Sequence, residues 1–247
     1  MVRFYAQSYS YDYPFPTVTL AYFLRYPNPF STHVLSTDVI SKTFDAEAQR
    51  LHITRLHLKR SKLPSAVLRL VPRSFLGASA QGDSQTYILE HSIVDVKEGW
   101  MRTESRNLEW TGVLSVVERQ EYSATLTLDP HGFDAKNPGD STAVKTTVTL
   151  HSRLGQQFKR KGEESTGFLR SWSQTATQRA IEAIGLRRAE KKSQPNAREG
   201  MKVVLERLRH GGLVEVLEGM RRDRESVLGH TGDGFKMIHH DDDSRKR

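Results

Sequence analysis

The 247-residue chain contains no cysteine. It therefore forms no disulfide, uses no catalytic thiol and holds no metal or iron–sulfur cluster through cysteine. Long hydrophobic runs are also missing, and no stretch approaches the 18 apolar residues of a membrane-spanning helix. There is no P-loop, no dinucleotide-binding glycine motif, no HExxH and no GxSxG. These absences favour a binding or carrier protein over an enzyme, and we expect no cofactor.

The first 15 residues lack the features of a targeting signal. Arg3 is their only base, and Asp12 and two prolines interrupt any apolar segment. Tyrosine recurs there at every second or fourth position, which is typical of a strand. We therefore expect this segment to form the first strand of the fold rather than a presequence.

Hydrophobic periodicity along the chain predicts an α+β fold. Short turns between consecutive strands predict an antiparallel sheet, with the helices on one face. The expected strands are 2–11, 33–44, 50–60, 86–96, 99–107, 112–128 and 142–152. The expected helices are 16–25, 165–189 and 197–222, with an exposed break at 191–195. We expect a domain at 1–210, a helical extension at 211–222 and a disordered tail at 223–247.

Residues 63–85 form an unusually long connection between two expected strands. Its second half is rich in Gly, Ala and Ser, and its first half is apolar, with Val67, Leu68, Leu70, Val71, Phe75 and Leu76. Loops of this length in a compact domain are usually functional, and an apolar surface loop must cover or enter something. We therefore expect a lid. The HHDDD cluster at 239–243 lies in the expected tail, where we expect solvated residues and no metal site.

The net charge of +8 is concentrated late in the chain. Residues 153–211 hold 14 of the 37 bases and 6 of the 29 acids, and the remainder is neutral. An anionic partner would account for this excess: a lipid surface, a nucleic acid or an acidic protein. A solvated helix face is the simpler alternative.

Five short motifs occur in a distinctive order. They are RYPNPFSTHVLS at 25–36, KRSKLP at 59–64, RNLEWTG at 106–112, SWS at 171–173 and REGM at 198–201. In this order they resemble blocks of the PRELI-domain family, the mitochondrial intermembrane-space phospholipid carriers. The resemblance covers residues 1–152 well and 165–210 loosely.

This resemblance implies a curved seven-stranded antiparallel sheet that, with a short N-terminal helix and a long C-terminal helix, encloses an apolar lipid cavity. It implies phospholipid transfer between the outer and inner mitochondrial membranes, with phosphatidic acid as the first expected cargo and phosphatidylserine as an alternative. The phospholipid would be cargo rather than a cofactor. The implied partners are a small twin C-x9-C helical protein, as a heterodimer, and an anionic membrane surface.

Five basic side chains are the candidate lipid contacts: Arg25, His33, Lys59, Lys62 and Arg179. Arg25 ends the first expected helix, so its guanidinium could point inward to a phosphate, or it could stay on the surface and complement the helix dipole. His33 could donate a hydrogen bond or be an ordinary strand residue. Lys59 and Lys62 flank the lid and could contact a headgroup or membrane, or be simply solvated. Arg179 is a candidate substitute for the Lys and Asn that relatives place on the corresponding helix, where this chain has Ala176, Gln178 and Ala180.

Two other classes of protein are the alternatives. A basic nucleic-acid-binding protein would fit the charge, but the chain has no RNP, KH or helix-turn-helix motif, and the aromatic residues of its first strand and helix lie away from the basic segment. A lipid-modifying enzyme is disfavoured by the missing catalytic groups.

Overall fold

The computed structural model describes residues 2–62, 83–109, 111, 114–125, 141–151 and 179–229. Most of the expected lid and the expected tail beyond 229 lie outside these residues. The elements are β1 (Val2–Tyr11), α1 (Phe15–Phe23), the 3-10 turn η1 (Pro29–Ser31), β2 (Val34–Asp45), β3 (Arg50–Lys62), β4 (Asp83–Asp95), β5 (Trp100–Asn107), β6 (Ser115–Ala124), β7 (Thr142–His151), the π-helical turn η3 (Ala189–Ser193) and α6 (Gln194–Gly229).

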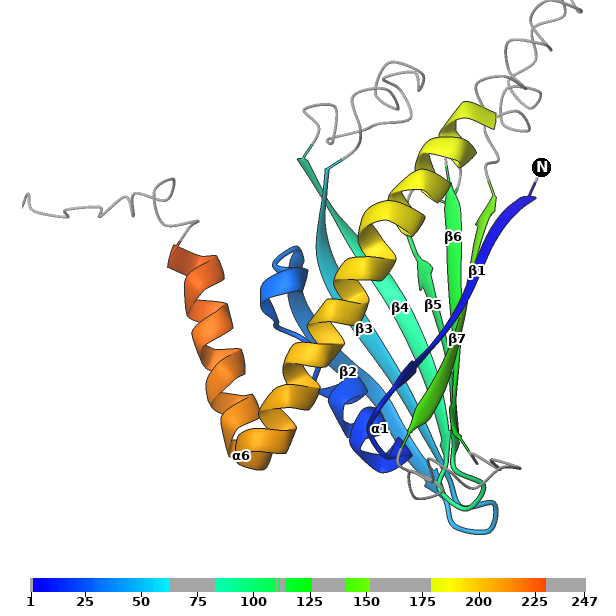
Figure 1. The fold of residues 1–247 in the computed structure, drawn as a ribbon. Coiled ribbons are helices and arrows are strands. Elements are labelled where there is room, and N and C mark those ends of the chain that lie inside the picture. Colours follow the sequence, from blue (N-terminus) through cyan, green and yellow to red (C-terminus); the bar gives the residue numbers. More distant parts are fainter. Residues whose placement is uncertain are drawn as a thin grey trace, which may run out of the picture.

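The seven strands form one antiparallel sheet in the order β1-β7-β6-β5-β4-β3-β2. Figure 1 shows the sheet curving around α1 and the long C-terminal helix, which lie on the same side of it. The two faces of the sheet differ in burial, as β7 illustrates: Val144, Thr146 and Val148 are buried on one face, while Lys145 is exposed on the other. The predicted α+β class, the strand positions and the antiparallel topology are confirmed.

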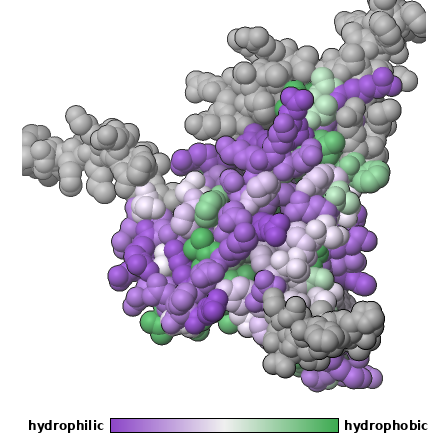
Figure 2. Space-filling model, viewed as in Figure 1, coloured by the Kyte–Doolittle hydropathy of each residue, from purple (hydrophilic) through white to green (hydrophobic). Residues whose placement is uncertain are grey.

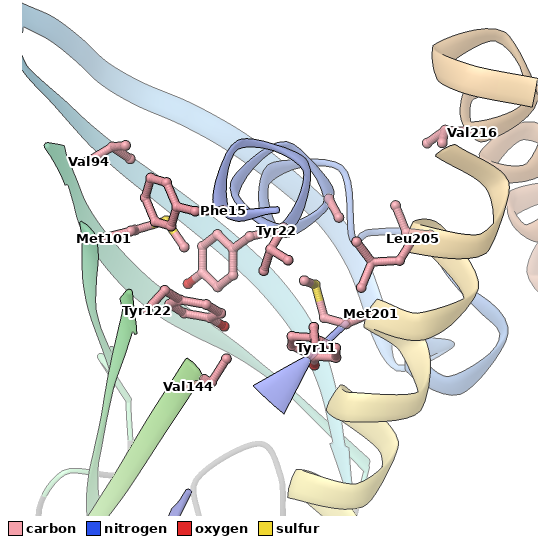
Figure 3. Close-up of a cluster of buried hydrophobic side chains, with 13 residues drawn as sticks. Tyr11, Phe15, Tyr22, Val94, Met101, Tyr122, Val144, Met201, Leu205 and Val216 are labelled. Carbon is pink, nitrogen blue, oxygen red and sulfur yellow. The ribbon is translucent and has the colours of Figure 1, made fainter. Parts of the chain in front are cut away.

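The core lies where α1 is held between the sheet and α6 (Figure 3). Val18 and Tyr22 of α1 are buried against the sheet, and the ring of Tyr22 packs edge-on against Tyr122 of β6 at 5.5 Å between centroids. From the other side, α6 contributes Met201 and Leu205. The face that carries α6 is otherwise mainly hydrophilic, with hydrophobic side chains visible only in small patches (Figure 2).

The predicted helix break at 191–195 is wrong. Residues 179–188 are helical, and the helix continues through the π-helical turn into α6. The amide of Gln194 donates to the carbonyl of Ala189, five residues back, so the hydrogen-bond ladder is already shifted where Pro195 lacks a donor. The chain instead bends at Gly212, whose φ of 61° and ψ of −150° suit glycine alone.

After Gly212 the second arm of α6 folds back on the first, and the predicted disorder of residues 223–229 is wrong. The Asp223 carboxylate accepts hydrogen bonds of 2.7 and 3.3 Å from the Arg207 guanidinium. Val216 is fully buried in the core cluster. A Cβ atom at Gly219 would lie 2.5 Å from the same guanidinium, so the close approach of the arms requires glycine. Charged residues that suggested a solvated tail therefore form the contact between the arms.

Loss of this ion pair should destabilise the second arm. In the Asp223→Asn variant, the half-buried Arg207 loses its counter-charge, and we expect the free energy of unfolding to fall by about 2 kcal/mol. Urea unfolding measures the fall, and hydrogen exchange should show faster exchange across 213–229. The matched control is Glu225→Gln, because Glu225 forms an exposed, 3.8 Å pair with Arg221 and should matter little. Equal effects of the two substitutions would contradict this account.

Candidate functional site

A cavity of about 640 Å³ lies between the sheet, the η1 turn and the C-terminal helix. Its wall is built from β1, β3, β4, β5, β6, the segment after α1 and helix residues between 188 and 201. This volume is typical of small-molecule sites in proteins. Three of the five predicted contacts, Arg25, His33 and Lys59, lie in the wall.

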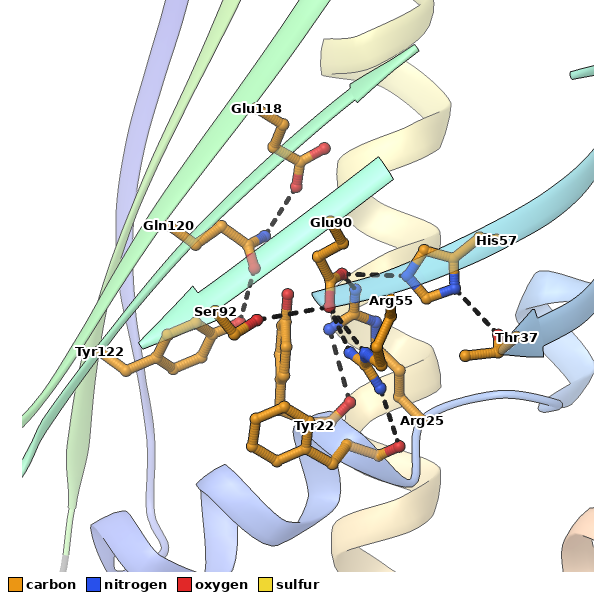
Figure 4. Close-up of polar contacts among 11 residues, drawn as sticks. Tyr22, Arg25, Thr37, Arg55, His57, Glu90, Ser92, Glu118, Gln120 and Tyr122 are labelled. Carbon is orange, nitrogen blue, oxygen red and sulfur yellow. Dashed lines mark hydrogen bonds and ion pairs between the residues drawn. The ribbon is translucent and has the colours of Figure 1, made fainter. Parts of the chain in front are cut away.

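The floor of the cavity holds one buried carboxylate, Glu90 of β4 (Figure 4). Its Oε1 accepts from the guanidinium of Arg55, through Nε at 2.9 Å and also through Nη2. Its Oε2 accepts from Nη2 of Arg25 at 2.5 Å and contacts Nε2 of His57 at 3.2 Å. The side chains of Glu90 and His57 are each only 1% exposed. Two strands, β3 and β4, and the end of α1 therefore meet at a single anionic group.

The cluster carries a net positive charge. Burial lowers the pKa of His57 and outweighs the opposite effect of Glu90, so the imidazole is neutral. It then donates from Nε2 to Glu90 and accepts at Nδ1 from the Thr37 hydroxyl, 2.9 Å away. Burial would raise the pKa of Glu90, but Arg25, His57 and Arg55 together hold it well below its usual value. Two guanidinium groups thus share one carboxylate, and one positive charge is left over.

Arg25 presents this charge to the cavity. Its side chain is 12% exposed, and its guanidinium lies over the rings of Tyr22 at 3.7 Å and Tyr26 at 4.8 Å. The alternative of a surface arginine complementing the helix dipole is therefore wrong. Arg55, in contrast, is 4% exposed and does not line the cavity.

The 25–36 motif folds into a tight turn that positions Arg25. Asn28 caps η1 by accepting from the Phe30 amide at 2.9 Å, and its Nδ2 donates to the Arg25 carbonyl at 2.5 Å. Asn28 is buried beneath α6, where a Cβ atom on Gly200 would lie 2.7 Å from its amide group. The RYPNP and REGM motifs therefore contact each other, although about 170 residues separate them.

A second group of bases lines the cavity beside His33: Lys59, Arg60, Arg188 and Lys192. Burial lowers the pKa of His33 to about 4, and the positive charges of Lys59, Arg188 and Lys192 act in the same direction. His33 is therefore neutral at pH 7, so it can contact a ligand in this cavity only through hydrogen bonds and not through a positive charge.

The remaining predicted residues are not brought to this wall. Arg179 is exposed on the helix and does not line the cavity, where Arg188 and Lys192 stand instead. Lys62 ends β3, but its side chain lies outside the described residues. So do the predicted lid residues Val67, Leu68, Leu70, Val71, Phe75 and Leu76.

Sequence reasoning missed Glu90, Arg55 and His57. A signal was present, since all three are polar residues that share an inward-facing register with apolar residues of the same strands. The wall of the cavity is accordingly mixed, and the expected apolar interior is present only in part. Phe30, Ile88 and Met201 share the wall with charged groups.

Within the described ranges, no group of three His, Asp or Glu side chains could hold a metal ion. In that part of the chain there is also no helix long and apolar enough to cross a membrane.

A curved antiparallel sheet closed by a helix over a cationic cavity defines a class of α+β ligand-binding protein. A sequence model of the PRELI-like family matches residues 16–184, and the chain belongs to this family. It is 34% identical to mitochondrial protein UPS1 of Saccharomyces cerevisiae over 175 residues, which cover 71% of this chain and 84% of that protein. The identity to mitochondrial UPS2 of the same yeast is 29%, covering 55% and 53% of the two chains.

A third relative is the mitochondrial PRELI domain-containing protein 1 of Gallus gallus, 34% identical over 44% of this chain and 47% of that protein. Among solved structures, the chain is similar to the Zhui aromatase/cyclase of a Streptomyces species, with a TM-score of 0.44 and 13% identity over 86% and 100% of the two chains. Similarity at that level does not bear on function.

The buried cluster predicts loss of stability in acid. His57 has a folded-state pKa below the value of about 6.5 expected in the unfolded chain. As the pH falls through 6.5, the unfolded chain therefore takes up a proton first, and the free energy of unfolding declines. Glu90 has a lowered pKa, so its contribution is present above about pH 4.3 and is lost only as the pH falls through its folded-state value.

Urea unfolding between pH 7 and pH 5 should therefore show declining stability, and His57→Leu should reduce the decline. The His91→Leu variant, altered at an exposed position of β4, controls for loss of an imidazole. An unchanged pH dependence in His57→Leu would contradict the assignment of His57 as a neutral donor.

Proposed function

We propose that this protein is a carrier that transfers an anionic glycerophospholipid, phosphatidic acid first, between the outer and inner mitochondrial membranes across the intermembrane space. One observation carries the proposal: a buried cluster with one uncompensated positive charge faces the cavity. A buried charge is costly unless a counter-charge pairs with it, and a lipid phosphate would supply that charge. The mitochondrial relatives and membership of the PRELI-like family support the location and the lipid cargo.

A carrier must offset the cost of removing a lipid from a bilayer. A two-chain phospholipid exposes roughly 30 methylenes at about 0.8 kcal/mol each, so on the order of 20 kcal/mol opposes its transfer to water. The described cavity supplies the polar end of such a site. Its mixed wall, with Phe30, Ile88 and Met201 near the bases, suits the glycerol and phosphate region of the lipid.

The number of bases around the cavity favours a headgroup of high charge. A phosphomonoester carries about −1.5 to −2 at pH 7, because its second pKa is about 6, whereas a phosphodiester carries −1. Arg25 is joined in the wall by Lys59, Arg60, Arg188 and Lys192. This excess of cations supports phosphatidic acid, whose headgroup is a phosphomonoester.

One observation favours phosphatidylserine as the second candidate. The carboxylate of Glu118 lies in the same wall and could pair with a headgroup ammonium. A nucleic-acid partner receives no comparable support, because these bases gather around one cavity rather than along an extended strip.

Arg25→Ala should reduce transfer of phosphatidic acid between vesicles by at least about tenfold, since a charge-assisted hydrogen bond to phosphate is lost. Fluorescent lipid measures the rate, and mass spectrometry should find the lipid chemically unchanged. An enzyme would alter the lipid mass.

The matched control is Arg102→Ala, which removes an arginine whose side chain is 66% exposed and pairs with Glu121 away from the cavity. Its transfer rate should equal that of the unaltered protein. Transfer by a folded Arg25→Ala variant at the same rate as Arg102→Ala would refute the role of Arg25.

We further propose a heterodimer with a small twin C-x9-C helical protein, as the family resemblance implies. Phe4 of β1 is 71% exposed and Leu20 of α1 is 45% exposed, so the first strand and helix offer apolar contact surface. Because this chain has no cysteine, the contact would be non-covalent.

Expressed alone, the full chain should aggregate or be degraded, because a partner that binds the folded state stabilises it. Coexpression should yield a soluble 1:1 complex without an intermolecular disulfide, as size-exclusion chromatography and non-reducing gels can show. The full chain is required because Val216 lies in the core. A monodisperse monomer that transfers lipid at full rate alone would exclude the partner requirement.

A further inference from the structure

The two oxygens of Glu90 have different partners. Oε1 is occupied by Arg55, which is also fixed by a 3.0 Å hydrogen bond from its Nη1 to the carbonyl of Phe23. Oε2 is shared by Arg25 and His57. Figure 4 shows these contacts converging on the carboxylate from separate elements.

Arg25 is held more loosely than Arg55. Besides its bond to Glu90, its guanidinium makes a long, 3.5 Å contact from Nη1 to the Tyr22 carbonyl and a hydrogen bond with the Tyr26 side chain. It lies over two tyrosine rings, which place no directional constraint on its nitrogen atoms. It also lines the cavity, whereas Arg55 does not. Arg25 can therefore turn toward a ligand while Arg55 stays in place.

We propose that Glu90 is the resting counter-ion of Arg25, and that the headgroup phosphate replaces Glu90 as the partner of Arg25 when lipid is loaded. This inference rests on the proposed function and assigns Glu90 as a positioning residue that acts through Arg25. Release reverses the exchange, because the carboxylate competes with the phosphate for the same guanidinium.

The remaining contacts allow this exchange without leaving a buried charge unpaired. When Arg25 turns away, Glu90 keeps Arg55 on Oε1 and the Nε2 donor of His57 on Oε2. The phosphate then neutralises the charge of Arg25. Each buried ion keeps at least one hydrogen-bonding partner before and after loading, and the phosphate adds the negative charge that the cluster lacks at rest, so neither state contains an isolated buried charge.

Removing the competing carboxylate should make the carrier hold its lipid too tightly. The test separates loading from release, using donor vesicles that contain phosphatidic acid and acceptor vesicles without it. In Glu90→Gln we expect more lipid retained per protein and release about tenfold slower, since Arg25 no longer has an internal charged partner. Arg25→Ala should lose loading itself. The Asp95→Asn variant removes another buried carboxylate, paired with Arg50 outside the cavity, and should leave retention and release unchanged.

A second variant covers the case in which Glu90→Gln does not fold. The Arg55→Gln/Glu90→Gln pair keeps the net charge of the cluster and should likewise release lipid about tenfold more slowly. If neither folds, His57→Leu decides: it removes the donor that Oε2 needs in the loaded state, and loading should fall about tenfold in the folded protein.

The outcomes separate the two proposals. The assays use the protein coexpressed with its small helical partner, and no transfer by the unaltered protein in this form would refute the proposed function, whatever the variants do. The role of Glu90 alone would be overturned if the unaltered protein transfers lipid and folded Glu90 variants release it at the normal rate. Where those variants do not fold, normal loading by His57→Leu would overturn it in the same way.

Discussion

The rest of the site depends on one buried carboxylate. Glu90 ties β4 to Arg55 and His57 on β3 and to Arg25 at the end of α1. Arg55 also binds the Phe23 carbonyl, so the same cluster fixes where α1 ends against the sheet. Apolar residues can often fill such a position with no loss of stability. Stability alone therefore does not account for an ionic cluster at this position.

Strands such as β7 were predictable because they alternate between a buried and a less buried face, and alternation is visible in the sequence. Arg25 was predictable from the motif that contains it. The partners of Arg25 were harder to predict, because Glu90 and Arg55 are 35 residues apart and meet only through the pairing of β3 with β4. Alternation shows that a polar residue faces inward, but it does not show which other polar residue lies opposite.

The helical region shows a different limit of sequence reasoning. Pro195 and its charged neighbours are local signs of a break, yet packing against η1 keeps the helix continuous there. The bend occurs at Gly212, and the second arm is held by the long-range pair of Arg207 with Asp223. Both outcomes depend on contacts between distant segments, so tertiary structure overrides the local preference.

The contact between Gly200 and Asn28 links two parts of the protein mechanically. The helix packs against the side-chain amide of Asn28 at Gly200. The same amide donates a hydrogen bond to the backbone carbonyl of Arg25. A movement of the helix away from the sheet, which would widen the cavity, must therefore remove the support under the turn that carries Arg25. Widening of the cavity and release of the turn that carries Arg25 are in this way parts of one motion, so the cavity cannot open while its buried cation keeps a fixed position.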